Sequence, residues 1–284
     1  MIVKAHAKIN LSLDVKNLRP DGYHDLETIM LPLELHDSLE ISVVHNSRCC
    51  DDYITCDDFE LGISKYNLCH KIIDEARKKW NFKENFNIDI HKNIFLRAGL
   101  GGGSADAAAT LQGIVKLLKI NASRQELIDL AINIGSDVPW ALFNEPCLVK
   151  RKGHVLEPFE SKTKFYVLLV KPTEGLSTQE VFHKGDELGF MIHGDINAVK
   201  DAFINGDEEM LGKLIFNSLE EPAFKMLPLV EGIKNKLLKD GLKVVLMSGS
   251  GSCIFGLTKD KKLVKKLEKI YSKDGYKVVL TQLL

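Results

Sequence analysis

The sequence lacks the long apolar segments that direct a chain into or across a membrane. No apolar run reaches the ~18 residues that a membrane-spanning helix needs. The first eight residues, Met1 to Lys8, contain no apolar core of a secretory signal. These features favour a cytoplasmic protein that has no membrane partner.

An excess of charge of either sign is also missing. The 38 basic and 39 acidic residues give a formal net charge of -1. Such a balance does not favour a nucleic-acid partner, although it is compatible with a local basic patch. Hydrophobic residues make up 45% and charged residues 27% of the 284 positions, which is typical of one large globular domain or two ordinary ones.

Paired cysteines are absent as well. The six cysteines contain no C-x-x-C pair, so we expect free thiols. A metal site built from Cys49, Cys50, Cys56 and His70 is disfavoured, because zinc ligands usually come in closely spaced pairs. We therefore predict no metal-ligating set of side chains, and we leave a redox role for Cys49 and Cys50 open.

The first strand shows a strict period of two. Residues Ala5 to Leu13 alternate with the polar residues His6 to Asp14, which predicts a strand with one buried face and one polar face. Lys8 and Asn10 would then project from the same side. The turn Arg19-Pro20-Asp21-Gly22 follows.

The rest of the first half mixes strands and helices. Residues 39–43 and 86–91 alternate as strands do, 45–60 reads as a polar loop, and Ser123 to Glu126 has the spacing of a capping box. The helical patterns cover residues 66–80, 107–118 and 124–134.

A new pattern begins near residue 160. Its order of strand, helices, two strands, helix and strand predicts an α+β sandwich of ferredoxin-like type. We therefore expect an N-terminal domain over 1–158 and a C-terminal domain over 159–284. The predicted strands are 165–170, 242–247, 253–257 and 276–281, and the predicted helices are 178–184, 195–204, 207–219, 225–239 and 260–272.

The glycine-rich segment Gly99 to Ser104 directly precedes one of these helices. Its four glycines let the backbone approach a ligand, and the helix start offers unpaired N–H groups to a phosphate. The Gly-Lys-Ser/Thr ending of a Walker A loop is missing, and Ser104 replaces the last glycine of the dinucleotide fingerprint. The alternating strand 86–91 also argues against a buried parallel sheet. A turn without a ligand remains the alternative.

Three further elements could carry chemistry. Asp137, in Gly135-Ser136-Asp137-Val138-Pro139, could be a general base for a hydroxyl, but taken alone a helix-capping role is favoured. Lys8, taken alone, is more typical of a solvated surface lysine. The small residues Ser248 to Ser252 form a tight loop that could lie against the same phosphates.

Together these motifs resemble the GHMP kinases, which include galactokinase, homoserine kinase and mevalonate kinase. The motifs are Ala7 to Leu11, the glycine loop with Ser104, Asp137-Val138-Pro139 and Ser248 to Gly251, in the family's order. The resemblance implies a two-domain α+β fold, with an N-terminal domain like ribosomal protein S5 and a ferredoxin-like C-terminal domain. It also implies ATP as co-substrate, Mg²⁺ accompanying it, and a small-molecule acceptor.

The family pattern assigns roles to individual residues. Asp137 would accept the proton of the acceptor hydroxyl, and Lys8 would hold that hydroxyl and Asp137 in place. The ATP-binding positions implied by the pattern are Lys92, Phe95, Leu96, Arg97, Ala98, Gly99, Leu100, Gly101, Gly102, Gly103, Ser104 and Ala105. The family usually has proline at the position of Phe95 and serine at that of Ala105.

Arg19 to His24 resembles the branch of the family that phosphorylates a diphosphocytidyl alcohol. This likeness implies that Tyr23 and His24 stack on and hydrogen-bond the cytosine, and that Phe182 covers the opposite face. Asn10 and Thr178 would contact the substrate, Thr178 near its diphosphate. For Phe182 the alternative is a core residue. Another kinase of the same superfamily, or a non-catalytic nucleotide-binding protein on the same scaffold, remains the alternative for the whole chain.

Overall fold

The computed structural model describes residues 1–44, 51–58 and 67–284. These residues form two compact units, each built from several separate segments. The first unit comprises 1–7, 35–94 and 101–144, and the second comprises 8–34, 95–100 and 145–284. Strands β1 (Ile2–Leu18) and β2 (His24–Val43) pair with each other, and each contributes one end to each unit.

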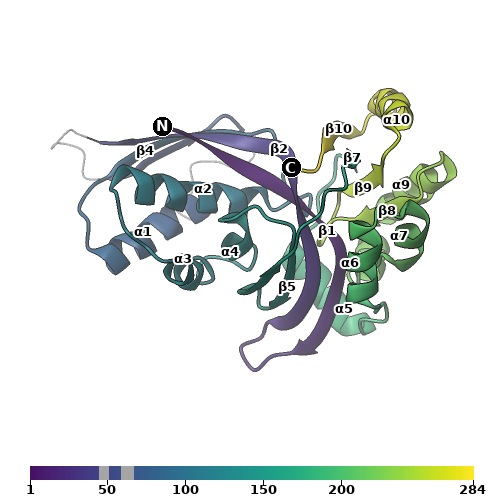
Figure 1. Cartoon of the computed structure of the whole chain (residues 1–284), viewed down its shortest axis with the longest axis horizontal. Helices are drawn as coiled ribbons and strands as arrows, with labels where there is room; N and C mark the ends of the chain where they lie inside the picture. The colour runs from purple at the N-terminus through teal and green to yellow at the C-terminus, as the bar shows by residue number, and fades with distance from the viewer. Residues whose placement is uncertain (45–50, 59–66) are drawn as a thin grey trace. The chain divides into compact units, whose positions relative to one another are not determined.

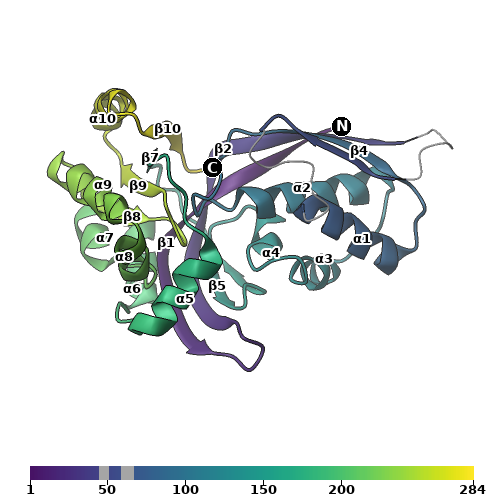
Figure 2. The same ribbon diagram turned by 180° about the vertical axis from the view of Figure 1, so that it is seen from behind.

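The first unit packs helices on a small sheet. Strand β4 (Phe86–His91) pairs antiparallel with the end of β2 and parallel with β3 (Tyr53–Cys56). The helices α1 (Leu68–Trp80), α2 (Gly102–Leu117), α3 (Arg124–Ala131) and α4 (Val138–Ala141) lie on one side of β2 and β4 in Figures 1 and 2. At Gly113 of α2, a Cβ would stand 2.5 Å from the Ile41 side chain, so a larger residue here would require that side chain to move.

Helices α1 and α3 begin close to where the sequence predicts, whereas α2 begins at Gly102, inside the glycine-rich segment and before the predicted start at residue 107. The capping box at Ser123 and Glu126 is present at the start of α3. Helix α1 starts at Leu68, where the Asn67 side chain accepts a hydrogen bond from the Cys69 N–H. Its buried face consists of Cys69, Ile72, Ile73 and Ala76, which recur at helical spacing.

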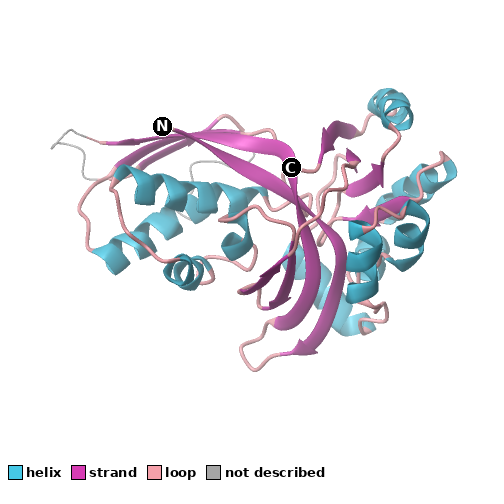
Figure 3. Ribbon diagram, in the orientation of Figure 1, coloured by secondary structure: helices cyan, strands magenta, loops and turns pink. Residues whose placement is uncertain are grey.

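The second unit contains a four-stranded antiparallel sheet in the order β10-β7-β9-β8. Its strands are β7 (Tyr166–Lys171), β8 (Val244–Met247), β9 (Ile254–Thr258) and β10 (Lys277–Gln282). With helices between β7 and β8 and between β9 and β10, this order is that of a ferredoxin-like sandwich, which confirms the prediction. Figure 3 shows this mixture of helix and strand throughout the molecule.

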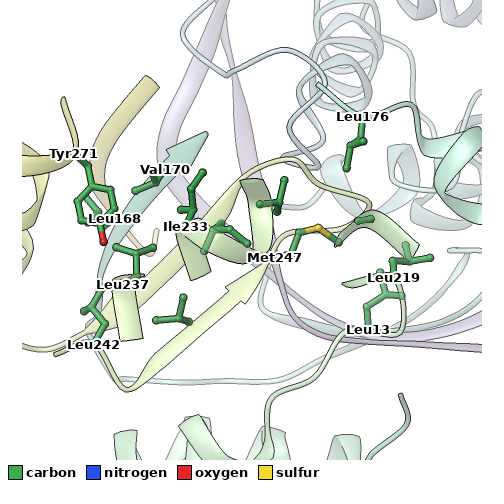
Figure 4. Packing of buried hydrophobic residues seen from close by; sticks show 14 of the residues in the cluster. Leu13, Leu168, Val170, Leu176, Leu219, Ile233, Leu237, Leu242, Met247 and Tyr271 are labelled. Carbon is green, nitrogen blue, oxygen red and sulfur yellow. The ribbon is translucent and has the colours of Figure 1, made fainter. Parts of the chain in front are cut away.

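The core of this sandwich lies between the sheet and two helices. Leu168 and Val170 of β7 meet Ile233 and Leu237 of α9 (Pro228–Lys239), together with Tyr271 of α10 (Lys261–Lys273), as Figure 4 shows. The cluster also includes residues of β1 and of helices α5 (Thr178–Leu188) and α8 (Glu220–Met226). Helices α6 (Ile196–Ile204) and α7 (Glu208–Leu214) complete the unit.

Several predicted boundaries are wrong. The helix expected over 207–219 ends at Leu214, because Ile215 turns extended and Phe216 and Ser218 hydrogen-bond to Leu13 of β1. The helix expected over 225–239 begins at Pro228, which is disfavoured inside a helix, and α8 precedes it.

Three short strands were not predicted. Tyr53–Cys56 is strand β3, although the polar stretch 45–60 indicated a loop; residues 45–50 and 59–60 lie outside the described residues. Strands β5 (Cys147–Arg151) and β6 (Val155–Pro158) extend the sheet beside β2 in the second unit, because β5 pairs with β2 and β6 pairs with β5.

Candidate active site

Helix α2 begins inside the glycine-rich segment, at Gly102, and belongs to the first unit. Gly101 occupies its N-cap with a φ of +72°, a left-handed conformation that favours glycine. Within the described chain, no side chain caps this helix and its first turn holds no acidic residue. Its first N–H groups therefore form the positive end of the helix dipole, and no acidic side chain of the first turn competes for them. Such a helix start suits an anionic phosphate.

Ala105 follows one turn later and is buried. Its N–H donates to the Gly101 carbonyl at 2.9 Å. The Ala105 side chain therefore lies in the packed interior of the first unit.

The preceding segment, residues 95–100, belongs to the second unit and lies against the loop Ser248 to Ser252. The Ser248 hydroxyl donates to the Gly99 carbonyl at 3.0 Å, and the Cys253 N–H donates to the Ala98 carbonyl at 3.3 Å. Ala98 and Leu100 are buried, whereas Arg97 is exposed, and Phe95 and Leu96 are half-buried. Two glycine-rich segments that are 149 residues apart thus share hydrogen bonds.

Lys8 lies at the end of a short chain of buried hydrogen bonds. Its ammonium donates to the Asn10 side-chain oxygen at 2.5 Å, and the Asn10 amide donates to the Thr28 hydroxyl at 2.9 Å. The Thr28 hydroxyl donates in turn to the Ser12 carbonyl at 2.6 Å. Lys8 is only 4% exposed, so the interpretation as a solvated surface lysine is wrong.

The polar face of β1 is buried rather than wet. Lys8, Asn10, Ser12 and Asp14 are all buried, because other segments of the second unit cover them. The Val15 N–H donates to the Ser218 hydroxyl at 3.1 Å, and Asp14 pairs with His193 at 2.6 Å. A buried ammonium costs free energy unless it is paired, so a buried Lys8 is a candidate functional residue.

The loop Ser248 to Ser252 lies beside Lys8 and Asn10. A Cβ on Gly249 would stand 3.2 Å from the Lys8 nitrogen and 3.3 Å from the Asn10 side-chain oxygen. Thr178, at the start of α5, shares a hydrogen bond of 2.8 Å between its hydroxyl and that of Ser250. The second unit therefore brings together Lys8, Asn10, Thr178 and this loop.

Asp137 precedes α4 in the first unit. It occupies the N-cap position, but in the described residues its side chain makes no capping hydrogen bond to α4, so the favoured capping role is wrong. Nearby, a Cβ on Gly135 would stand 3.9 Å from the Ser104 hydroxyl oxygen of α2. The segment that carries Asp137 thus lies beside the first turn of the phosphate-binding helix.

His24 lies in an aromatic cluster of the second unit. Its ring stacks on Phe182 with centroids 5.5 Å apart and meets the edge of Phe190 at 5.2 Å. The Asp186 carboxylate lies 2.9 Å from its Nε2 atom. Phe182 packs partly against the core, as its alternative interpretation predicts, and His24 covers one of its faces. A stacked base would have to use the other face.

Tyr23 is half-exposed, with the Lys152 ammonium 3.8 Å from its ring centroid. Sequence reasoning missed Lys152, Asp186 and Phe190, because they lie far from the Arg19 to His24 motif in the chain and belong to no pattern of their own.

Lys92 belongs to a buried ionic cluster that sequence reasoning also missed. Its ammonium pairs with Asp37 and, at 2.6 Å, with Asp106 of α2. Asp37 also accepts backbone N–H bonds from Asn93 at 2.6 Å and from Ile94 at 2.8 Å. The cluster therefore ties the end of β4 to the first turns of α2.

The cluster also changes the pKa of its members. Burial, opposed by Lys92, raises the pKa of Asp106 above its ordinary value of 3.8. Burial by itself lowers the pKa of Lys92. The negative charges of Asp106 and Asp37 outweigh burial, so the pKa of the lysine is raised.

Cys56, Cys69, Cys147 and Cys253 are free thiols. Cys49 and Cys50 lie outside the described residues. Among residues 1–44, 51–58 and 67–284, no group of three or more His, Cys, Asp or Glu side chains is arranged to hold a metal ion. No helix in that part of the chain is long and apolar enough to cross a membrane.

Comparison with known families gives two matches. Residues 67–145 match the GHMP kinases N terminal domain, and residues 199–277 match the GHMP kinases C terminal domain. These ranges include the glycine loop and Asp137 in the first case and the loop Ser248 to Ser252 in the second.

Individual relatives resemble the chain over nearly its whole length. A putative 4-diphosphocytidyl-2-C-methyl-D-erythritol kinase of Streptococcus mutans is 34% identical, with 98% of each chain covered. The 4-diphosphocytidyl-2-C-methyl-D-erythritol kinase of Thermoanaerobacter pseudethanolicus is 37% identical over 95% of this chain and 90% of that protein.

Solved structures agree with these matches. A crystal structure of 4-(cytidine 5'-diphospho)-2C-methyl-D-erythritol kinase has a TM-score of 0.82 and 28% identity, covering 100% of this chain and 99% of that one. Homoserine kinase from Cytophaga hutchinsonii shares the fold, with a TM-score of 0.70 at 14% identity, covering 100% of this chain and 94% of that one. The expected two-part α+β fold is thus confirmed, and the chain belongs to the GHMP kinases and, among them, to the family of 4-diphosphocytidyl-2-C-methyl-D-erythritol kinases.

Proposed function

We propose that this chain transfers the γ-phosphoryl group of ATP to the 2-hydroxyl of 4-diphosphocytidyl-2-C-methyl-D-erythritol, in the non-mevalonate route to isoprenoid precursors. The observation that carries this proposal is the buried ammonium of Lys8, held by Asn10 beside the loop Ser248 to Ser252. An ammonium kept in a fixed place inside a protein suits a reaction in which negative charge moves between oxygen atoms.

In this mechanism the substrate oxygen attacks the γ-phosphorus of ATP. A new bond forms between that oxygen and phosphorus, the bond from the γ-phosphorus to the β-phosphate oxygen breaks, and ADP leaves. The hydroxyl proton passes to the Asp137 carboxylate, which acts as general base. Lys8 positions the hydroxyl and stabilises the transferring charge. The pairing of Lys8 with Asp137, which belong to different compact units, is part of the proposal.

The N-terminus of α2 is the proposed phosphate site. Its unblocked N–H groups would bind the triphosphate, with residues 95–105 and Lys92 around the nucleotide. The buried pairing of Lys92 with two carboxylates suggests that this lysine supports the site through α2 as well.

Mg²⁺ is proposed to accompany ATP. The Ser104 hydroxyl, in the first turn of α2, offers an oxygen donor. Magnesium typically takes one or two protein oxygens together with substrate phosphates, so Ser104 fits this role. Ser104 would hold the ion, which would neutralise charge on the phosphates.

Recognition of the cytosine is assigned to Tyr23, His24 and Phe182, with Asn10 and Thr178 contacting the rest of the substrate. The cluster around His24 supports this assignment, because a ring fixed by Phe190 and Asp186 presents a constant surface to a base. We also propose the division into a catalytic part over 1–158 and a substrate-binding part over 159–284, and a cytoplasmic location.

The test is a substrate panel with the purified chain. ADP formation from ATP and Mg²⁺ is measured with the diphosphocytidyl alcohol, homoserine and mevalonate, and the product is identified by phosphorus NMR. We expect turnover with the diphosphocytidyl alcohol alone. Turnover with homoserine or mevalonate instead would assign the chain to another activity of the superfamily, and ATP binding without any turnover would indicate a non-catalytic protein.

A further inference from the structure

Asn217 is a fully buried polar residue that the mechanism above does not use. It lies between α7 and α8, where the chain runs beside Leu13 of β1. The Phe216 carbonyl accepts the Leu13 N–H at 3.0 Å, and the Ser218 N–H donates to the Leu13 carbonyl at 2.9 Å. The backbone around Asn217 is therefore fixed to the strand that carries Lys8.

The side chain of Asn217 holds the start of the loop Ser248 to Ser252. Its amide nitrogen donates to the Met247 carbonyl at 2.9 Å and to the Gly249 carbonyl at 2.8 Å. Its side-chain oxygen accepts the Leu219 N–H at 2.9 Å. Both donors and the acceptor are thus used within the protein, and one carboxamide bridges the two carbonyls that flank Ser248.

A second side chain of the same segment supports this bridge. The Glu220 carboxylate accepts the Met247 N–H at 3.0 Å and pairs with Lys234 at 2.6 Å. Asn217 and Glu220 therefore fix both polar groups of the Met247 backbone. The loop cannot move away from β1 without breaking buried hydrogen bonds, which is costly because the separated groups would lack partners.

The part of the loop that Asn217 holds lies next to Lys8, the candidate catalytic lysine. The Cβ position of Gly249 is 3.2 Å from the Lys8 nitrogen, 3.3 Å from the Asn10 side-chain oxygen and 3.1 Å from the Gly99 carbonyl oxygen. A lysine side chain has four rotatable bonds, and Asn10 accepts a hydrogen bond from its end. Gly249 lies so close that a methyl group there would touch the same ammonium, so this part of the loop bounds the space into which the ammonium could move.

We propose that Asn217 is a positioning residue for phosphoryl transfer. Its carboxamide holds the Gly249 backbone against the Lys8 ammonium and so keeps that ammonium in its reactive place. This inference rests on the proposed function, because it acts through the role assigned to Lys8. Small displacements of a reacting group can cost about 100-fold in rate, so the contribution is measurable.

The test is a double-mutant cycle with Lys8. Asn217→Ala is expected to lower kcat by about 10- to 100-fold with a smaller rise in the KM for ATP, since the loop contacts Gly99 of the ATP-binding segment but does not carry the N-terminus of α2. In a Lys8→Met background the same substitution should have almost no further effect, because its target is gone. If the fold-losses in kcat of the two single variants multiply in the double variant, Asn217 acts on stability or on another group. That result would overturn the proposal.

A control and a second variant keep the test decisive. Tyr271→Phe removes the partly buried hydrogen bond from the Tyr271 hydroxyl to Asp240 in the same unit. It should lower stability without changing kcat. If Asn217→Ala does not fold, Gly249→Ala takes its place, because the added methyl group presses on Lys8 directly. Wild-type kcat in Gly249→Ala would overturn the proposal.

The wild-type chain separates the two hypotheses. Absence of turnover with the diphosphocytidyl alcohol contradicts the proposed function itself. If the wild type turns over normally, two results contradict only the positioning role. In one, Asn217→Ala has the wild-type kcat; in the other, its loss in kcat is the same with and without Lys8→Met.

Discussion

The carbonyl oxygen of Ser248 lies 1.9 Å from the position that a Cβ on Gly99 would occupy. Gly99 also has a φ of +72°. The two glycine-rich segments of the second unit can approach this closely only because position 99 has no side chain, and the obstructing atom is backbone that cannot rotate away.

Gly99→Ala is therefore expected to destabilise the protein more than a left-handed conformation alone explains. Gly22 provides the matched control, because its φ is +79° and nothing lies within 4 Å of its Cβ position. Each alanine should cost about 1–2 kcal/mol for the backbone conformation. The overlap at Gly99 should add about 1–3 kcal/mol in the free energy of unfolding. Equal denaturant midpoints for the two variants would contradict the observed packing.

Lys8→Met should remove catalysis without removing the fold. The methionine chain fills a similar volume, whereas the ammonium and its hydrogen bond to Asn10 are lost. We expect kcat to fall by about 100- to 1,000-fold, as for other groups that stabilise transferring charge. Lys16→Met, on the same strand, is the control, because its ammonium pairs with Asp14 and is partly exposed. A kcat of Lys8→Met equal to that of Lys16→Met would exclude the role of Lys8.

Asp106→Asn tests the buried cluster through the pH dependence of stability. The pKa of Asp106 is raised by burial, so the folded chain binds its proton more tightly than the unfolded chain does. The stabilisation that this proton provides is present at low pH and is lost as the pH rises from about 4 towards neutrality. The groups around Asp106 are Asp37, Lys92, Cys56 and Cys69, and burial raises the pKa of both thiols, so neither thiol titrates in this window.

The asparagine variant should therefore lose less stability than the wild type between pH 4 and neutral pH. Urea unfolding at a series of pH values measures this difference. Asp129→Asn, on the surface of α3, should keep the wild-type slope. If Asp106→Asn also keeps the wild-type slope of stability against pH, the stabilising proton is not bound at Asp106.

Phe182→Ala should weaken recognition of the cytosine and leave ATP unaffected. Stacking of a base on an aromatic ring contributes about 1–3 kcal/mol, so the KM for the diphosphocytidyl alcohol should rise by about 5- to 150-fold. Phe159→Ala serves as the control, because this half-buried ring contacts only Phe203 among the aromatic rings of the described residues. Unchanged KM values in Phe182→Ala would assign this ring to the core alone.

Local patterns predicted the elements of this protein well. Alternation at 86–91 gave strand β4, and the Ser123 to Glu126 spacing gave the start of α3, because both depend on neighbours in the sequence. The ferredoxin-like order of the second half was also predictable, since each of its strands is a distinct apolar segment.

Burial that depends on distant segments was not predictable. Lys8 and Asn10 lie on a polar face that the sequence alone presents as wet, and distant segments such as the loop at Gly249 contribute to their burial. The cluster of Asp37, Lys92 and Asp106 joins three separate elements without a shared motif. The roles of the candidate site residues stay predictions for the same reason.

The most direct test compares phosphate transfer by the wild-type chain and by Asp137→Asn, with ATP and the diphosphocytidyl alcohol. The account predicts that the wild type forms ADP and the phosphorylated alcohol in equal amounts. It predicts that Asp137→Asn loses about 100- to 10,000-fold in kcat, as expected for removal of a general base, while binding ATP as the wild type does. Wild-type turnover by Asp137→Asn, or no transfer by the folded wild-type chain, would contradict it.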